Sequence, residues 1–407
     1  MVAPVMVKRI VLLNQMAGPL SRETAEGLAP YMEDGCLLLT GHPDTVSLAD
    51  HTVPGLVIRK APGYSRRTLL HRFLSWVSYL LVSSWTILGA RKSDAFLIVS
   101  NPPMMGAWFC LLNMFRRQPY AVLVYDIHPD VLVSMGMLRE SGLIVSLWRM
   151  INNIVYENAL IVITLGERLA TRLSENMPVN CDKPAVIPPW ADTDKIRPLI
   201  SSENLLVDRF NPENRKVILY SGNMGISHDI DSIFEAAKLL KNREDVLFVF
   251  IGSGEKWQDA RDFGEHHGLD NIQVHPFQPE ENLPYTMALA SISLVALDKG
   301  AEGLMVPSKL FYYLAAGSAV IGICEDDNEL RDIIEGAGCG YCVRSGNPAA
   351  LAKTIEGLLD DEDALTRARR AARNLAEQTY SRTAGVQKFV TELQKAGLIP
   401  PQVEAEC

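Results

Sequence analysis

Short, uninterrupted apolar runs recur along this 407-residue chain, and segments with helical periodicity lie between them. Strands buried on both faces look like this, because helices cover both sides of a parallel sheet. The alternation of such strands with helices is typical of the doubly wound α/β class. The predicted strands are 8–13, 36–40, 95–100, 120–125, 159–164, 216–220, 246–251, 292–297 and 319–323, and the predicted helices include 229–241, 255–267 and 348–359.

The alternation is interrupted once, near the middle of the chain. Pro188, Pro189 and Trp190 end the first half, and the prolines and serines of 198–212 oppose regular structure there. At roughly 100–200 residues per domain, the length suggests two domains. We predict an N-terminal domain over 1–195, a C-terminal domain over 196–378, and a helical tail over 379–407 that packs back on the N-terminal domain.

The net charge of −9 is unevenly distributed. Residues 55–120 carry nine basic residues against one acidic residue, Asp94, so this segment is +8 and the remainder is −17. A basic segment in an acidic protein indicates an anionic partner or surface. Nucleic acid is not expected, because apolar helices rather than stacking aromatic platforms separate the basic residues. The basic residues are Arg59, Lys60, Arg66, Arg67, Arg72, Arg91, Lys92, Arg116 and Arg117.

Two apolar helices are predicted inside this basic segment, at 69–88 and 104–115. The first has the length of a membrane span, but Arg72 lies within it, basic residues flank both ends, and strands of one sheet precede and follow it. One alternative is two ordinary core-packing helices. The basic flanks favour amphipathic helices that contact an anionic membrane. The predicted acceptor and membrane residues are Arg66, Arg67, Arg72, Trp76, Arg91, Lys92, Trp108, Arg116 and Arg117.

No metal or cofactor is expected from the sequence. The seven cysteines have no framework spacing, which is typical of reduced thiols in the cytosol. Cys339 and Cys342 form a lone CxxC without a second ligand pair. Two Asp-x-Asp motifs are present: 192–194 follows a proline break, and 229–231 opens a helix as a cap. We interpret both as structural rather than as metal ligands.

Three segments after predicted strands have the character of a phosphate site, because ligands of doubly wound sheets bind at the carboxyl ends of the strands. Gly222, Asn223 and Gly225 open one helix, and Gly252, Gly254 and Glu255 open another. Glycines allow close backbone approach, and helix N-termini supply free N–H groups. The third segment is Glu302 to Gly317, in which Pro307 suits a first helical turn, Ser308 and Lys309 suit an anion, and Glu302 suits sugar hydroxyls.

The third segment resembles the EGxxVPSKLYxYLAAGxPVI signature of bacterial glycosyltransferase family 4, in the exopolysaccharide and O-antigen subgroup of WcaI-like and WbuB-like transferases. Further landmarks agree in order: the YSGNxG-like stretch at 220–225, the F-x-P-x-x-x-LP-like stretch at 277–284, the V-I-P-N-W-x-D-like stretch at 186–192, and the D-x-x-P-like stretch at 126–129. The resemblance covers about residues 8 to 390.

This resemblance implies a GT-B fold, in which two Rossmann-like domains face each other across a cleft. It implies that the C-terminal domain binds a nucleotide-sugar and the N-terminal domain an acceptor, with retention of anomeric configuration and without a metal. The implied catalytic residues are Asp126, His128, Glu302 and Lys309. The implied donor-binding residues are Gly18, Gly222, Asn223, Gly225, Gly252, Gly254, Glu255, Pro307, Ser308, Lys309 and Tyr312.

The chain departs from the family pattern at three positions. Asn223 and His228 stand where many members carry an Arg and a Lys, and Tyr312 lies near the position of a second Glu that commonly holds the ribose. Positive charge for a leaving diphosphate is then expected from Lys309, from helix N-termini and from His228. The sequence offers no convincing second carboxylate for double displacement, which favours front-face departure with His128 as an orienting group.

The favoured function is transfer from a nucleotide diphosphate sugar, a UDP-sugar first, to a polyprenyl-diphosphate-linked saccharide. The enzyme would act in the cytoplasm, peripherally bound to the inner face of the cell membrane. One alternative is a nucleotide-sugar epimerase of the same fold, which would leave the basic, apolar N-terminal half unexplained. A second is a non-catalytic, membrane-bound subunit that binds a nucleotide-sugar, an alternative that the three departures leave open.

Overall fold

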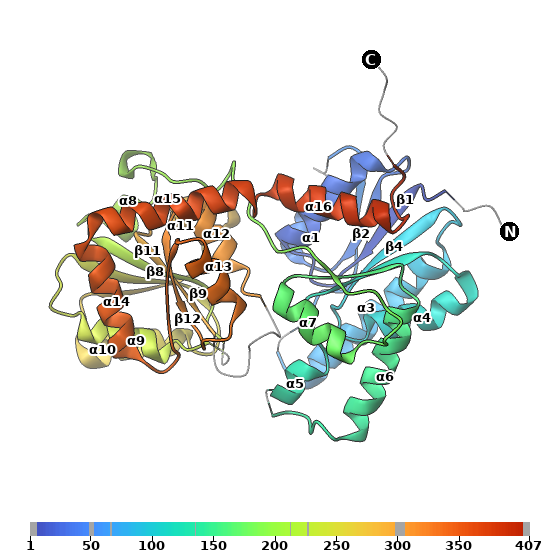
Figure 1. The fold of residues 1–407 in the computed structure, drawn as a ribbon, viewed down its shortest axis with the longest axis horizontal. Helices are drawn as coiled ribbons and strands as arrows, with labels where there is room; N and C mark the ends of the chain where they lie inside the picture. Colours follow the sequence, from blue (N-terminus) through green and yellow to red (C-terminus); the bar gives the residue numbers. More distant parts are fainter. Residues whose placement is uncertain are drawn as a thin grey trace, which may run out of the picture. The chain divides into compact units, whose positions relative to one another are not determined.

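A computed structural model describes residues 6–48, 53–65, 67–134, 136–211, 213–225, 228–297 and 306–401. The chain divides into two compact units, which we describe separately (Figure 1). Unit 1 comprises Met1–Pro188 and Gly385–Cys407, and unit 2 comprises Pro189–Ala384. The predicted boundaries at 195 and 378 lie a few residues from these divisions.

Unit 1 is built on a seven-stranded sheet in the order β3-β2-β1-β4-β5-β6-β7, with every neighbouring pair parallel. Its strands are β1 (Arg9–Leu13), β2 (Cys36–Thr40), β3 (Leu56–Lys60), β4 (Asp94–Val99), β5 (Tyr120–Val124), β6 (Ile161–Thr164) and β7 (Ala185–Val186). Its helices are α1 (Pro19–Leu28), α2 (Pro43–Ser47), α3 (Leu69–Leu88), α4 (Met105–Arg116), α5 (Asp130–Ser134), α6 (Leu143–Glu157), α7 (Glu167–Asn176) and α16 (Arg382–Lys395).

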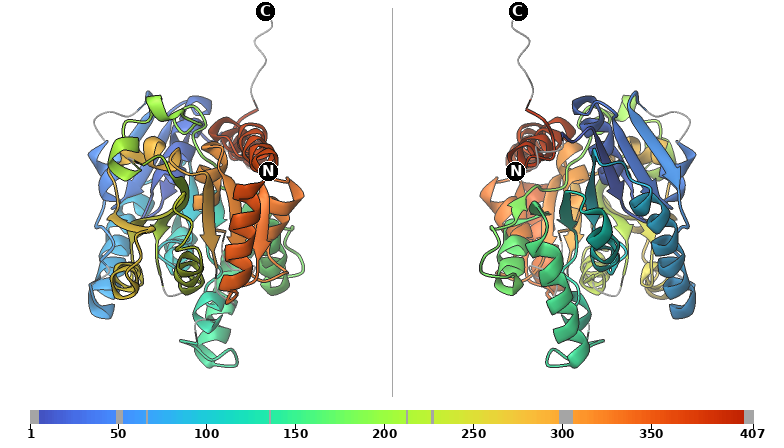
Figure 2. Two further views of the ribbon diagram at one scale, coloured as in Figure 1. Left: turned by 90° about the vertical axis from the view of Figure 1, so that its left-hand side faces the viewer. Right: turned by 90° about the vertical axis from the view of Figure 1, so that its right-hand side faces the viewer.

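Helices α3, α4 and α6 lie side by side on one face of this sheet (Figure 2). Right-handed crossovers explain the placement, because the chain moves across the sheet in one direction from β3 to β4, β5 and β6. Trp108 of α4 joins two of the helices, since its indole Nε1 donates to the Leu80 carbonyl and the Ser84 hydroxyl of α3, both at 3.0 Å.

Unit 2 repeats the plan with a six-stranded parallel sheet in the order β10-β9-β8-β11-β12-β13. Its strands are β8 (Lys216–Asn223), β9 (Val246–Ser253), β10 (Ile272–Pro276), β11 (Ile292–Ala296), β12 (Ala319–Ile323) and β13 (Gly340–Val343). Its helices are α8 (Val207–Phe210), α9 (Asp231–Leu239), α10 (Trp257–His267), α11 (Leu283–Met287), α12 (Lys309–Ala315), α13 (Glu329–Gly336), α14 (Pro348–Asp360) and α15 (Glu362–Gln378). In both units the strand order reverses beside the first strand, which creates the crevice where doubly wound folds bind ligands.

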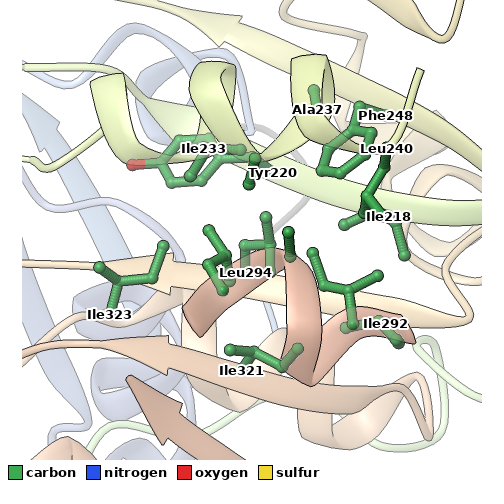
Figure 3. Close-up of a cluster of buried hydrophobic side chains, with 14 of the residues drawn as sticks. Ile218, Tyr220, Ile233, Ala237, Leu240, Phe248, Ile292, Leu294, Ile321 and Ile323 are labelled. Atoms are coloured by element: carbon green, nitrogen blue, oxygen red, sulfur yellow. The ribbon is translucent and has the colours of Figure 1, made fainter. Parts of the chain in front are cut away.

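Strand β8 shows why the strands of unit 2 appear as continuous apolar runs. Ile218 and Tyr220 belong to the buried cluster on one face of the sheet (Figure 3), whereas Val217 and Leu219 belong to the cluster on the other face. Successive side chains of a strand point to opposite faces, so a strand covered on both sides must be apolar at every position. The prediction of a helix-covered parallel sheet is therefore confirmed in detail here.

Several predicted boundaries need correction. Strands β8 and β9 do not end at 220 and 251, since their ladder continues through the pairs Gly222–Gly252 and Asn223–Ser253. Helix α12 begins at Lys309 with Ser308 as its N-cap, so Pro307 precedes the helix rather than occupying its first turn. Helix α3 covers the predicted 69–88. Within the described part of the chain, no helix has both the length and the hydropathy needed to cross a bilayer.

Candidate donor and catalytic sites

The predicted phosphate site of unit 2 begins at the paired ends of β8 and β9. Gly222, Gly252 and Gly254 have φ angles of 134°, 157° and 128°, a region that side chains disfavour. A Cβ on Gly252 would lie 1.9 Å from the Gly222 carbonyl oxygen, and one on Gly254 would lie 2.5 Å from the Met224 oxygen. The glycines are therefore needed for the close approach of two backbones, whatever ligand binds beside them.

Lys309 extends from the start of α12 to these glycines. Its Nζ donates a 2.6 Å hydrogen bond to the Tyr220 hydroxyl and lies 3.8 Å from the centre of that ring. A Cβ on Gly222 would lie 3.4 Å from the same Nζ. Burial lowers the pKa of Lys309 to about 7. Lys309 is half-buried, and among the described residues its amine has no acidic partner.

Tyr313, one turn into α12, fixes the helix to the end of β8. Its hydroxyl donates to the Ser221 carbonyl at 3.0 Å and accepts from the Ser221 amide at 2.7 Å. Burial raises the pKa of this phenol, which keeps it a neutral donor and acceptor. The two bonds explain how Lys309, four residues earlier, reaches the strand end with a defined geometry.

The loop after β8 also has a fixed conformation. The Gly225 amide donates to Nδ1 of His228 at 3.2 Å, and Lys256 Nζ donates to the His228 carbonyl at 3.0 Å and pairs with Asp231 at 2.8 Å. Burial, with the charge of Lys309 and Lys256, lowers the pKa of His228 to about 4. His228 is therefore neutral near pH 7, and it does not replace the positive charge that its position has in many family members.

The remaining predicted donor residues differ in placement. Asn223, Glu255 and Ser308 are exposed, and Tyr312 is half-buried. A Cβ on Gly225 would lie 2.8 Å from the Asn223 amide nitrogen and 3.8 Å from a Glu255 carboxylate oxygen, so these residues are brought together beside the glycines. Glu302 lies outside the described residues.

The predicted catalytic pair of unit 1 follows β5. Burial raises the pKa of the Asp126 carboxyl and lowers that of the His128 imidazole, while the opposite charge of each partner opposes the shift. The His128 ring stacks on Trp148, with centroids 6.0 Å apart, and Asn152 holds the His128 carbonyl at 2.7 Å. Nδ1 of His128 is buried without a hydrogen-bond partner among the described residues, which is unusual for a purely structural histidine.

Gly18, also predicted for the donor site, precedes α1. A Cβ there would meet its nearest described neighbour, Nε2 of His42, at 3.9 Å, which is ordinary contact. Packing therefore does not require a glycine at this position. Ser21 of α1 joins this loop to the end of β5, since its hydroxyl shares a 2.8 Å hydrogen bond with the Tyr125 hydroxyl.

The described basic residues predicted for acceptor and membrane contact divide between the two ends of α3. Arg67 and Arg72 lie at the N-terminal end, with Arg72 over the Tyr64 ring at 5.9 Å. Arg91 and Lys92 follow its C-terminal end, where Arg116 and Arg117 end α4. A 20-residue helix is about 30 Å long, so the two groups are far apart. Arg66 lies outside the described residues, and Trp76 stacks on Tyr64 with centroids 6.3 Å apart.

Between these ends lies an exposed apolar surface, which the sequence predicted only in part. It includes helix α6, which the prediction missed. This helix has more apolar residues than one buried face can hold, so several of them are exposed. Large exposed apolar patches on a protein surface mark interaction sites. We name it the three-helix surface, and its exposed side chains are Leu70, Phe73, Leu74, Leu81, Trp85, Leu88, Leu111, Met114, Phe115, Leu143, Ile144, Leu147, Met150 and Ile154.

Both Asp-x-Asp motifs accept hydrogen bonds from nearby backbone amides, although Ile230 rather than Asp229 is the N-cap of α9. Asp192 accepts from the amides of Asp194 and Lys195 at 3.1 Å, and Asp229 accepts from the amides of Ser232 and Gly346 at 3.1 and 2.7 Å. The described residues contain no group of three or more His, Cys, Asp or Glu side chains that could hold a metal ion.

Comparisons with known proteins agree with the geometry. Residues 202–375 match the family described as glycosyl transferases group 1. The chain is 26% identical over 332 residues to the probable glycosyltransferase WbjE of Pseudomonas aeruginosa, covering 81% of this chain and 82% of that protein. It is 24% identical over 335 residues to the putative colanic acid biosynthesis glycosyl transferase WcaI of Escherichia coli (strain K12), covering 80% of each.

Solved structures show the same fold at lower identity. Anabaena Alr3699/HepE in complex with UDP and glucose superposes with a TM-score of 0.73 at 13% identity, over 95% of this chain and all of that one (100%). WaaG, a glycosyltransferase involved in lipopolysaccharide biosynthesis, gives a TM-score of 0.66 at 13% identity, over 97% and 100%. The two parallel-sheet units therefore form a GT-B fold, as predicted.

Proposed function

We propose that this chain, a glycosyltransferase of group 1 in polysaccharide biosynthesis, moves a sugar with retention from a nucleotide diphosphate sugar to a lipid-linked saccharide at a membrane. The observation that carries the proposal is the half-buried Lys309 amine, with its pKa lowered to about 7, beside three glycines at the ends of β8 and β9. Such a cation is costly to bury alone, and a diphosphate is the ligand that would neutralise it. We favour a UDP-sugar, because the structural neighbour HepE binds UDP and glucose.

The proposed chemistry is mainly electrostatic. As the bond between the sugar and the diphosphate breaks, negative charge grows on the leaving oxygen, and Lys309 with the backbone amides of the glycine strand ends stabilises it. The leaving phosphate oxygen takes the proton of the acceptor hydroxyl while the new glycosidic bond forms on the same face. His128 and Asp126 would orient the reacting groups, and Gly18 would allow the diphosphate to approach. Asn223, Glu255, Pro307, Ser308, Tyr312 and Glu302 would hold the rest of the donor.

The acceptor part of the proposal rests on unit 1. An apolar surface on three helices, with basic residues at both ends, suits a protein that lies on an anionic membrane and takes a lipid-linked substrate. A cytoplasmic enzyme at the inner face of the membrane follows from the nucleotide-sugar donor. The basic residues Arg66, Arg67, Arg72, Arg91, Lys92, Arg116 and Arg117 would contact lipid phosphates or the acceptor diphosphate.

A non-catalytic, nucleotide-sugar-binding subunit is the second candidate, because a neutral His228 and Asn223 leave Lys309 as the main cation of the site. Acceptor-dependent release of UDP from UDP-sugars separates the two functions. If the protein is a transferase, UDP release should require a polyprenyl-diphosphate-linked acceptor. The rate of this release should fall in His128→Asn, while the affinity for UDP stays the same. UDP binding with no release in any acceptor series would favour the subunit, and release without an acceptor would contradict both candidates.

A further inference from the structure

A groove of about 680 Å³ lies between α4 and α6, at the amino-terminal edge of the seven-stranded sheet. Its walls are mostly apolar, and Leu111, Met114 and Ile154 line it while also belonging to the three-helix surface. The groove is therefore continuous with that exposed surface. Its volume is within the roughly 300–1,000 Å³ of small-molecule sites.

The polar groups of the groove already have partners inside the protein. Tyr120 donates to the Val155 carbonyl at 2.7 Å and shares a 3.2 Å contact with the Cys110 thiol. The Asn113 side chain accepts from the Gln118 backbone amide at 2.8 Å and donates to the Gln118 carbonyl at 2.9 Å. These groups have little left to offer a ligand, so the body of a ligand that fills the groove must be apolar.

Arg117 is the exception. It lies at the end of the groove, it is exposed, and its side chain has no ion pair or hydrogen bond to any described residue. Arg91, Lys92 and Arg116 are exposed at the same edge of the sheet. The Gln118 side chain donates to the Arg91 carbonyl at 2.8 Å, which ties the ends of α3 and α4 together here. A ligand for this groove should therefore carry a negative charge at one end of an apolar body.

We propose that the groove between α4 and α6 binds one anionic phospholipid, with an acyl chain along the apolar walls and the phosphate at Arg117. The ligand is a membrane lipid rather than the reacting end of an acceptor. Asp126 and His128 follow the carboxyl end of β5, whereas the groove lies at the strand's beginning, at Tyr120. This inference deepens the membrane part of the proposed function, on which it rests, and it uses none of the donor residues.

Native mass spectrometry of the full chain tests the proposal directly. The probes are short-chain phosphatidylglycerol and phosphatidylcholine with identical acyl chains. We expect one bound phosphatidylglycerol per chain, with about fivefold preference over phosphatidylcholine, because one cation near anionic lipid changes affinity by roughly that factor. Equal binding of the two lipids, or many lipids per chain without a preferred first one, would overturn the proposal.

Two variants and one control variant locate the lipid. Arg117→Asn removes the charge but tolerates the left-handed conformation at this position (φ 51°), so the headgroup preference should vanish. Lys353→Asn, which removes an exposed charge from unit 2, should keep it. Ala107→Phe fills the groove and should remove the bound lipid, although it adds apolar surface. Lipid that remained bound in Ala107→Phe would place it elsewhere on the three-helix surface.

A measurement on the unaltered chain avoids any folding defect of the variants. Cys110 lines the groove, whereas Cys181 lines a separate, more polar pocket of unit 1. Phosphatidylglycerol should slow alkylation of Cys110 by N-ethylmaleimide and leave the rate at Cys181 unchanged. Protection of neither thiol, or of both equally, would contradict the proposal. Stronger protection by a single-chain prenyl phosphate would assign the groove to the acceptor lipid instead. UDP binding, measured in parallel, reports separately on the donor site.

Discussion

The environment of Lys309 lowers the pKa of its amine, and this shift affects how the site binds an anion. Its ammonium lies against a tyrosine ring and hydroxyl with no described acidic neighbour, and its pKa falls from 10.5 to about 7. Near neutral pH the free protein is therefore an equilibrium between charged and neutral forms of this side chain. An anionic ligand favours the charged form, so binding and protonation must be linked.

The first prediction is a pH dependence. Between pH 7 and 10.5 the unfolded chain retains a proton that the folded chain releases, so Lys309 makes the free energy of unfolding rise with pH in this window. The affinity for UDP should change in the opposite direction. Above pH 7 the binding of UDP takes up a proton at Lys309, so the affinity weakens as the pH rises. Calorimetry of UDP binding at alkaline pH, in buffers of different ionisation enthalpy, should show this uptake. Lys309→Met should bind without it, and equal uptake in both proteins would contradict the assignment.

The second prediction concerns Gly252. A side chain does not fit at this position, because a Cβ would lie 1.9 Å from the Gly222 carbonyl oxygen, and the φ of 157° is itself unfavourable for residues other than glycine. Gly252→Ala should lower the free energy of unfolding by about 2 kcal/mol or more. The control is Gly357→Ala in α14, where a Cβ meets nothing within 4 Å and a helix gains roughly 0.5–1 kcal/mol. Urea unfolding of both variants gives the comparison. An unchanged free energy of unfolding in Gly252→Ala would show that the ends of β8 and β9 can separate to admit a side chain.

At the scale of elements, the central strands could be predicted and the edge strands could not. The predictions missed β3, β7, β10 and β13, which are the outer strands of the two sheets. Edge strands are partly solvated, so they carry polar residues, as in the sequence IQVHP of β10, and lose the continuous apolar pattern. The prediction also ended β8 too early, because glycines were interpreted as a loop although their backbones still pair with β9.

The contact between α12 and β8 gives the third prediction. Tyr313→Phe removes the hydroxyl that bonds both backbone groups of Ser221 and leaves them buried, which should cost about 1–3 kcal/mol. Because Lys309 then loses its fixed position, UDP affinity should fall as well. Tyr79→Phe is the matched control, since its buried hydroxyl donates to the Leu39 carbonyl in unit 1. It should destabilise the protein without changing UDP affinity, and equal affinity losses in both variants would indicate a general effect of instability.

At the scale of the whole molecule, the sequence predicted two doubly wound units. It could not predict how the basic residues are distributed. Residues 55–120 are continuous in sequence, but the long helix α3 separates their basic members. The contribution of α6 was also missed, because the exposed face of a helix is decided by its neighbours rather than by its own periodicity. Spatial grouping of this kind depends on tertiary packing.

The fourth prediction concerns the membrane surface. Replacing Arg91, Lys92, Arg116 and Arg117 together by Ser should reduce sedimentation with phosphatidylglycerol vesicles, because each basic residue near an anionic leaflet contributes about 1 kcal/mol. The same loss should follow from raising the salt concentration on the unaltered protein. Binding to phosphatidylcholine vesicles should be weak throughout. Full binding of the fourfold variant to anionic vesicles would contradict a docking role for this edge of unit 1.

The central claim is that Lys309 and the glycine strand ends bind the diphosphate of a nucleotide. Thermal unfolding with UDP, GDP, ADP and TDP, on the unaltered chain and Lys309→Met in parallel, tests it most directly. A ligand at 100 times its Kd stabilises the folded state by about 2.7 kcal/mol. We predict a shift with UDP above the other nucleotides, strongly reduced in Lys309→Met because a charge-assisted bond of roughly 1.5–3 kcal/mol is lost. No shift with any nucleotide, or equal shifts in the two proteins, would contradict the donor site.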